Sequence, residues 1–227
     1  MERALRSVAP EVLEIERCDG FRSMSNLDWW LRDPAARPPA DVAALDWITG
    51  GPVLDVGCAT GRHVEALRER GIDATGIDSC PAAVELATRA GYDCRVGDAW
   101  QPPAGAGYAA VTLLGANLGI AGTVARVPGF LSTLAAALRP GGQLIVTSID
   151  WRMSTGPHEE FVAAQLGAGR YPGDAQLRLR LGDAAVSTWF DWVWVDQDTL
   201  REAASTVGLR MVDVMSWRHH YAARLVA

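Results

Sequence analysis

The sequence contains no lysine, and all 21 of its basic residues are arginine. Without a lysine amine the chain cannot form a Schiff base with pyridoxal phosphate or carry a lysine-bearing phosphate loop. The formal net charge is −6, and no basic cluster compensates it. Because a nucleic-acid-binding protein normally presents a basic stripe to the phosphates, this composition disfavours RNA and DNA and favours a small-molecule substrate.

Cysteine is scarce, and long hydrophobic runs are missing. Cys18, Cys58, Cys80 and Cys94 form no C-x-x-C pair, and no secretory hydrophobic segment begins the chain. We therefore expect reduced thiols in a cytoplasmic protein. No zinc-binding motif is present, so no metal is expected. The apolar stretch 109–121 is too short to span a bilayer, which disfavours a membrane protein.

Short apolar runs alternate with helical patterns along the middle of the chain. The apolar spacing and the Gly and Pro positions predict helices at 62–70, 81–90 and 129–138, and strands at 52–56, 74–77, 92–96, 109–114 and 143–149. Strands that alternate with helices of this length form βαβ units, so the pattern predicts an α/β fold with a parallel sheet. The strand at 109–114 is entirely apolar, which predicts a central position.

The C-terminal region predicts one more helix at 198–207 and two strands at 209–217 and 219–226. Almost no loop separates these two strands, so they must pair antiparallel, because a parallel crossover needs a dozen or more residues. We therefore assign 51–149 and 197–227 to one core.

Two segments lie outside this core. Residues 150–196 form an insertion with a predicted β-hairpin, in which 177–181 pairs with 188–195 across a turn near Gly182-Asp183. Residues 1–50 are interrupted by prolines and cannot form a core alone, so we predict an N-terminal helical cap that carries Trp29 and Trp30.

The segment from Asp55 to Gly61 lies where a buried strand turns into a helix. Glycines there let a ligand approach the backbone, and the helix N-terminus offers unpaired N–H groups. The dinucleotide pattern G-x-G-x-x-G is incomplete because Ala59 follows Cys58, and Asp55 stands two residues before Gly57. An acid at this place suits a cationic ligand without phosphates, such as S-adenosylmethionine.

Two further acids follow the next two strands. Asp78 closes the second strand, where a carboxylate can accept both ribose hydroxyls. Asp98 follows the third strand, where it could accept from an adenine amino group while Ala99 and Trp100 cover the ring. All three acids should lie at the carboxyl edge of the sheet, where open α/β sheets bind ligands. The alternative is that they are ordinary loop carboxylates and helix caps.

These pieces together resemble the class I S-adenosylmethionine-dependent methyltransferases. The resemblance spans about residues 50 to 150 and rests on Asp55–Gly61, Gly76-Ile77-Asp78, Gly97-Asp98-Ala99 and Leu138–Leu144. It implies a seven-stranded, mostly parallel sheet with helices on both faces and its last strand antiparallel between the fifth and the sixth. It also implies S-adenosylmethionine as cofactor. The departures are Ala59, where the family usually has glycine, and Ala109, where it often has Asp.

The same resemblance implies roles for individual residues around the cofactor. Asp55, Gly57 and Gly61 would hold the methionine end, Asp78 the ribose and Asp98 the adenine. We expect the remaining contacts from Cys58, Ser79, Ala99 and Trp100 in the same loops, and from Gly115 after the fourth strand.

Candidates for the acceptor chemistry lie after the fourth strand and in the insertion. Asn117 could orient the substrate or the cofactor, or satisfy its own turn. His158 is the candidate general base, and an exposed helix histidine is the alternative.

Phe190, Trp192 and Trp194 share one face of a strand and could pack on the sheet or line a pocket for a flat apolar substrate. Its candidate polar contacts are Asp191, Arg178, Arg180, Arg152 and Tyr171, with solvated strand arginines as the alternative.

The sequence therefore predicts methyl transfer to a small molecule, within specialised biosynthesis, by a monomer or homodimer. Two alternatives stay open. One is a protein that binds S-adenosylmethionine without transferring its methyl group, as a partner subunit or a rearrangement catalyst. The other is a nicotinamide-dependent oxidoreductase, against which the incomplete glycine pattern argues.

Overall fold

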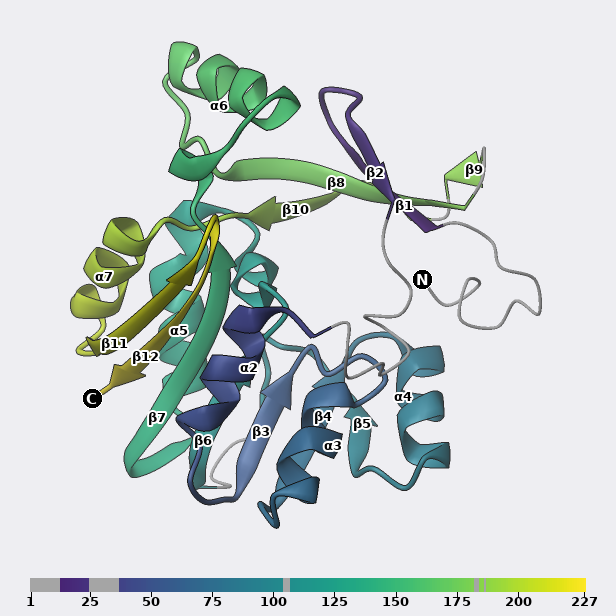
Figure 1. Cartoon of the computed structure of the whole chain (residues 1–227), viewed down its shortest axis with the longest axis vertical. Coiled ribbons are helices and arrows are strands. Elements are labelled where there is room, and N and C mark those ends of the chain that lie inside the picture. Colours follow the sequence, from purple (N-terminus) through teal and green to yellow (C-terminus); the bar gives the residue numbers. More distant parts are fainter. Residues whose placement is uncertain (1–12, 25–36, 104–106, 182–183, 186) are drawn as a thin grey trace.

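The computed structural model describes residues 13–24, 37–103, 107–181, 184–185 and 187–227. Trp29 and Trp30 of the predicted cap, and the predicted turn at Gly182-Asp183, lie outside these ranges. The described residues form a seven-stranded sheet with helices on both faces and a smaller second sheet across one end of it (Figure 1).

The large sheet has the predicted topology. Its strands run in the order β11-β12-β7-β6-β3-β4-β5. In chain order they are β3 (Val53–Val56), β4 (Ala74–Asp78), β5 (Cys94–Val96), β6 (Tyr108–Leu113), β7 (Leu138–Ile149), β11 (Arg210–Trp217) and β12 (His220–Val226). The pairs from β7 to β5 are parallel, and β12 is antiparallel to both β7 and β11. The predicted antiparallel last strand and the central position of β6 are both confirmed.

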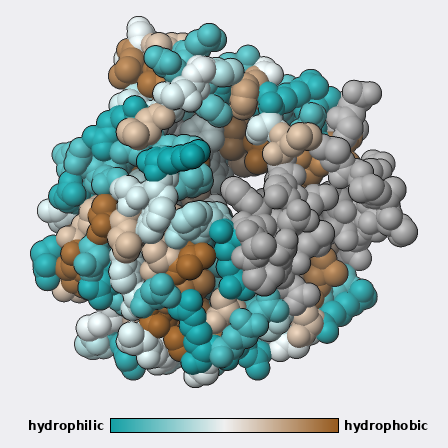
Figure 2. Space-filling view, in the orientation of Figure 1, coloured by the Kyte–Doolittle hydropathy of each residue, from teal (hydrophilic) through white to brown (hydrophobic). Residues whose placement is uncertain are grey.

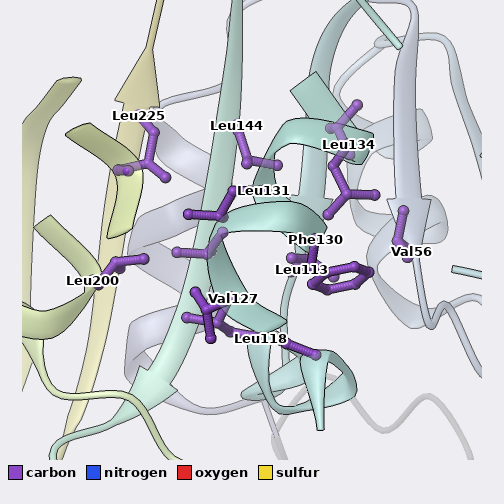
Figure 3. Packing of buried hydrophobic residues seen from close by; sticks show 14 of the residues in the cluster. Val56, Leu113, Leu118, Val127, Phe130, Leu131, Leu134, Leu144, Leu200 and Leu225 are labelled. Carbon is purple, nitrogen blue, oxygen red and sulfur yellow. The ribbon is translucent and has the colours of Figure 1, made fainter. Parts of the chain in front are cut away.

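Helices cover both faces of this sheet, as the family resemblance implied. One face packs against α2 (Pro39–Asp46), α3 (Arg62–Glu69) and α4 (Pro81–Arg89), and the other against α5 (Val127–Ala135) and α7 (Gln197–Thr206). Alternate residues of a strand point to opposite faces, so Val53 joins the first layer and Leu54 the second. Figure 3 shows the second layer, in which Phe130 and Leu131 of α5 belong to the apolar cluster between the sheet and the helices that cover it.

One helix–strand boundary differs from the prediction. Helix α5 ends at Ala135 rather than near residue 138, and β7 begins at Leu138 rather than at Gln143. Leu138 pairs with Tyr108, and the next pair is Ala110 with Gln143, so the intervening residues bulge out of the ladder. Gly141 has a φ of +73°, a conformation that few side chains tolerate, and it lets the chain turn within the bulge.

The prediction of a helical cap is wrong for residues 13–24, because their strands belong to the second sheet. This sheet contains β1 (Leu13–Arg17), β2 (Arg22–Met24), β8 (Asp174–Leu181), β9 (Ala184–Ala185) and β10 (Phe190–Val193). Residues 13–17 read Leu-Glu-Ile-Glu-Arg, an alternation with the period of a strand that the surrounding prolines obscured. Among the described residues of the first fifty, only α2 is an α-helix.

The insertion contains two antiparallel strands as predicted, but in another register: residues 174–177 of β8 pair with 190–193 of β10, so only Leu177 of the predicted strand 177–181 pairs with β10. Arg178 and Arg180 were predicted as substrate contacts or solvated arginines, and both instead contact Glu16. β8 pairs with β10 and, on its other side, with β1. Glu16 of β1 accepts hydrogen bonds from Arg178 Nε at 2.9 Å and from Arg180 Nη1 at 3.1 Å. Arg180 is buried, and β1, which pairs edge to edge with β8, supplies its carboxylate partner. These ion pairs join β1 to the insertion.

The two sheets meet where Trp192 of β10 covers Gly119 in the 3₁₀ helix η3 (Asn117–Ala121). A Cβ atom on Gly119 would lie 2.1 Å from Trp192 Cε2, so no side chain fits. Replacing Gly119 with alanine should cost about 1–3 kcal/mol of unfolding free energy and lower the melting temperature by roughly 3–10 °C. Gly129→Ala, with no atom within 4 Å of its Cβ, is the matched control for the melting curves. Equal stability of the two variants would contradict this packing.

Within the described ranges, no helix is both long enough and apolar enough to cross a membrane. On the face that Figure 2 shows, hydrophobic residues lie in small groups among hydrophilic ones.

Candidate functional site

The loop after β3 is shaped by glycines and held by Asn117. Gly57 and Gly61 have φ values of +74° and +86°, and a Cβ on Gly57 would lie 2.5 Å from Asn117 Nδ2. The Asn117 amide donates to the carbonyl oxygens of Gly57 at 2.9 Å and Val56 at 3.2 Å. Asn117 therefore positions this loop rather than satisfying its own turn, and the loop keeps its backbone open to a ligand.

Asp78 lies at the carboxyl end of β4 and already organises two loops. Its Oδ2 accepts the Ala59 N–H at 2.9 Å, and its Oδ1 accepts the Cys80 N–H at 2.8 Å. Burial raises the pKa of Asp78 above its ordinary value, although the two N–H groups oppose this shift. Each oxygen keeps a further lone pair, so the carboxylate can still accept the two hydroxyls of a ribose. Ser79 beside it is exposed.

Asp98 lies one strand further along and is exposed. Its Oδ1 accepts the Trp100 N–H at 2.9 Å and its Oδ2 accepts Gln101 Nε2 at 3.2 Å, which closes a turn. The indole of Trp100 lies against Phe130, with ring centroids 4.7 Å apart. Ala99 is half-buried beside it. Contact of this turn with adenine stays a prediction.

The sequence predicted that Asp55 and Cys58 contact the cofactor, but both side chains are buried in the core. Asp55 is buried beneath the loop, where Oδ1 accepts the Thr112 hydroxyl at 2.7 Å and Oδ2 lies 3.4 Å from His63 Nδ1. The Cys58 thiol also points into the core, toward Gly76 of β4. The neighbouring Cys94 thiol and burial raise the pKa of Cys58. Asp55 therefore supports the loop from below, and only the backbone of Cys58 is available to a ligand.

A small cavity of about 40 Å³ opens above this loop. Its lining consists of Gly57, Cys58, Ala59, Arg62, His63, Leu114, Gly115 and Asn117. Four of these were predicted to bind the cofactor or the substrate, namely Gly57, Cys58, Gly115 and Asn117, and the fold brings them together. Arg62 was missed by sequence reasoning, although its place directly after Gly61 at a helix N-terminus was a usable signal.

Below this cavity lies a buried charge cluster that the sequence did not reveal. His63 Nε2 lies 3.3 Å from Asp41 Oδ2, and Arg62 Nη2 lies 3.5 Å from the same oxygen. The other oxygen of Asp41 accepts the Gly115 N–H at 2.9 Å and the Thr147 hydroxyl at 3.2 Å. Asp41 belongs to α2, so the N-terminal region supports both loops that line the cavity.

Two opposing influences act on the charge of His63. Asp55 and Asp41 outweigh burial and raise the pKa of His63 above its ordinary value. Arg62 Nε donates to His63 Nε2 at 3.2 Å, a contact that favours the neutral ring because Nε2 must then accept. Burial alone would raise the pKa of Asp41, but His63, the Gly115 N–H and Arg62 together hold it below its ordinary value. The two imidazole–carboxylate contacts are longer than a usual hydrogen bond.

A second, larger cavity of about 160 Å³ lies between the second sheet and the end of β7. Its walls come from both sheets, from α6 (Pro157–Gly167) and from the β11–β12 turn: Arg17, Ile149, Trp151, Met153, Ser154, Thr155, His158, Phe161, Val162, Pro172, Trp194 and His219. Of the predicted acceptor-site residues, His158 and Trp194 line it. His158 lies in the first turn of α6 and is exposed, as the alternative interpretation expected.

Several side chains that were predicted to contact the substrate instead form hydrogen bonds with neighbouring loops and strands. The Tyr171 hydroxyl donates to Asp196 at 2.8 Å and accepts the Trp151 indole N–H at 3.0 Å. Arg152 donates to both oxygens of Asp150, at 2.9 and 2.7 Å. Asp191 accepts from the Gln176 side chain at 3.1 Å. None of the three predicted contacts lines the described cavity, because each points to a neighbouring loop or strand.

The two cavities lie close together along β7. The Thr147 hydroxyl accepts at 2.9 Å the N–H of Ala116, which lies in sequence between two lining residues of the small cavity, Gly115 and Asn117. Ile149, two positions further along the same strand, lines the large cavity. Two positions along a strand correspond to about 7 Å.

These features define a class: an α/β protein of Rossmann-like topology with a glycine loop and cavities at the carboxyl edge of its sheet, where open α/β sheets bind ligands. Residues 29–214 match the family model described as a methyltransferase domain, so the chain belongs to that family.

Comparisons with individual proteins agree with this assignment. A SAM-dependent methyltransferase from Bacteroides fragilis, solved with S-adenosyl-L-homocysteine, has a TM-score of 0.81 at 23% identity over 99% of this chain and 91% of that one. The 1,6-didemethyltoxoflavin-N1-methyltransferase of Burkholderia thailandensis has a TM-score of 0.57 at 19% identity over 87% and 80%. Both show the shared fold.

A curated relative matches only a part of the chain. The ubiquinone biosynthesis O-methyltransferase of Pseudomonas paraeruginosa is 39% identical over 67 residues, which are 26% of this chain and 29% of that protein. The chain thus covers less than a third of the length of that relative.

Proposed function

We propose that this protein transfers the methyl group of S-adenosylmethionine to a small molecule bound in the cavity between the two sheets. The observation that carries this proposal is that β7 borders both sites: Ile149 lines that cavity, and Thr147, two positions earlier, binds the N–H of Ala116, next to the Asn117 that holds the glycine loop. Methyl transfer needs an in-line approach of acceptor and methyl group, and the enzyme contributes mainly this positioning.

The residues present fit the cofactor. Asp78 keeps lone pairs for a diol, and Gly57, Arg62 and Gly115 line the small cavity beside it. S-adenosylmethionine, when bound, supplies an electrophilic methyl group. Small-molecule acceptors are also named for the toxoflavin and ubiquinone enzymes to which this chain is similar.

The setting of this reaction is also a proposal. All four cysteines are free, which supports a reducing compartment such as the cytoplasm. The net charge of −6 supports a small-molecule rather than a nucleic-acid partner. Participation in specialised biosynthesis and the monomeric or dimeric state stay predictions.

The test is formation of S-adenosylhomocysteine by the purified chain with S-adenosylmethionine and a broad panel of small phenols, amines and thiols. We expect product with a subset of the panel, and loss of that product in the Asp78→Ala variant. Tight cofactor binding without turnover on the whole panel would favour the alternative of a binding protein. Preference for NAD(H) in a parallel titration would contradict the assignment.

A further inference from the structure

The imidazole of His158 is held in one protonation state by a residue of the second sheet. Arg17 Nη1 on β1 lies 2.9 Å from His158 Nδ1. A guanidinium has donors and no acceptor, so Nδ1 must accept this hydrogen bond and cannot carry a proton. The single N–H of the neutral ring therefore lies on Nε2.

Arg17 is itself fixed in place. Its Nε and Nη2 donate to the two oxygens of Asp19 at 2.9 and 2.7 Å, and Nη2 also donates to the Pro157 carbonyl at 2.9 Å. Its guanidinium lies 4.1 Å from the ring centroid of Phe161, and only 2% of its side chain is exposed. With these partners the guanidinium cannot turn away, so the contact with His158 is built into the fold.

The groups around His158 keep the ring neutral. Burial and then the charges of Arg17 and His219 lower the pKa of His158 below its ordinary value, and Asp19 opposes them only in part. The ring also packs edge-on against Phe21, at 4.7 Å between centroids. At neutral pH His158 thus presents a hydrogen-bond donor, and it lacks the free lone pair that a general base needs.

The cavity beside this donor suits an anion with a flat apolar body. The described lining contains Arg17, His158 and His219 but no carboxylate, in a protein whose net charge is −6. Three aromatic side chains, Trp151, Phe161 and Trp194, contribute to its walls. Its volume of about 160 Å³ is close to the roughly 150 Å³ of an apolar cavity that holds benzene.

We propose that this cavity takes an acceptor with one aromatic ring and an ionised ring oxygen, a phenolate, and that His158 Nε2–H donates the hydrogen bond that holds this oxygen. The phenol loses its proton to solvent on binding. Its oxygen then forms the new O–CH₃ bond while the S–CH₃ bond breaks and the electron pair of that bond stays on sulfur. The inference rests on the proposed function, since it names the acceptor class of the same site.

The test uses 4-nitrophenol, whose phenolate has its own absorption band, with the full chain saturated by S-adenosylhomocysteine. We expect the bound probe to ionise at lower pH than the free probe. His158→Asn keeps an amide near Nδ1 for Arg17 but places nothing at Nε2, so phenolate affinity should fall at least about tenfold. His158→Gln restores an N–H near Nε2 and should lose less than about threefold.

Two further measurements distinguish failure of this inference from failure of the proposed function. S-adenosylhomocysteine affinity, measured by calorimetry, and affinity for uncharged nitrobenzene should be unchanged in both variants, which shows that the fold and the cavity are intact. If His158→Asn binds the phenolate as tightly as the wild type, or if the bound probe ionises like the free one, the inference is wrong. If the wild type fails to bind S-adenosylhomocysteine, the proposed function itself fails.

Discussion

Replacement of Asp78 with alanine is expected to weaken the binding of S-adenosylhomocysteine by about 100-fold. The carboxylate can accept two ribose hydroxyls, and a hydrogen bond to a charged group is worth about 1.5 kcal/mol or more. Two such bonds correspond to a factor of about 100 in affinity. The loss also removes the acceptor of the Ala59 N–H, so the loop that faces the methionine end loses a support. Isothermal titration calorimetry measures the effect directly.

Asp93→Ala is the matched control for this experiment. Asp93 is another acid beside the neighbouring strand, directly before its first residue, and it is exposed and pairs only with Arg95 among the described residues. It should bind S-adenosylhomocysteine like the wild type. Asp78→Asn should give an intermediate affinity, because an amide oxygen can still accept one of the hydrogen bonds. Wild-type affinity in Asp78→Ala would mean that the nucleoside lies elsewhere on the sheet.

Replacement of His63 with alanine should lower the free energy of unfolding by about 3–5 kcal/mol, since it leaves Asp41 and Asp55 buried without their shared cationic partner. For a chain of this length, such a loss lowers the melting temperature by roughly 10 °C. Chemical denaturation and calorimetry measure the two quantities.

The stability contributed by His63 should depend on pH with a defined sign. Its folded pKa is raised, so the folded state binds a proton that the unfolded state releases. The contribution is complete below the unfolded pKa, about 6.5, and is lost as pH rises through the folded pKa. His219→Ala, which removes an exposed histidine, should keep the wild-type slope. An identical pH slope in His63→Ala and the wild type would show that His63 is not charged.

The core of the fold could be predicted because its signals are local. Buried strands such as Val53–Val56 and amphipathic helices such as Arg62–Glu69 show their periodicity within one segment. Parallel strands joined by helices then align their carboxyl ends without further information. The positions of Gly57, Asp78 and Asp98 at one edge follow from this rule alone. The strand Leu13–Arg17 was also locally encoded, but one of its two partners, β8, lies more than 150 residues away.

The sequence by itself therefore determined the class of fold, the cofactor loop and the acids beside it. Only the tertiary structure decided that Asp55 supports the loop from below, that Asp41 of α2 completes the charge cluster, and that Arg17 holds the His158 ring. The physical reason is separation along the chain: Asp41 and Gly115 are 74 residues apart, and Arg17 and His158 are 141 residues apart. The periodicity of a single segment cannot predict a contact between such distant residues, because the contact forms only when separate elements pack together.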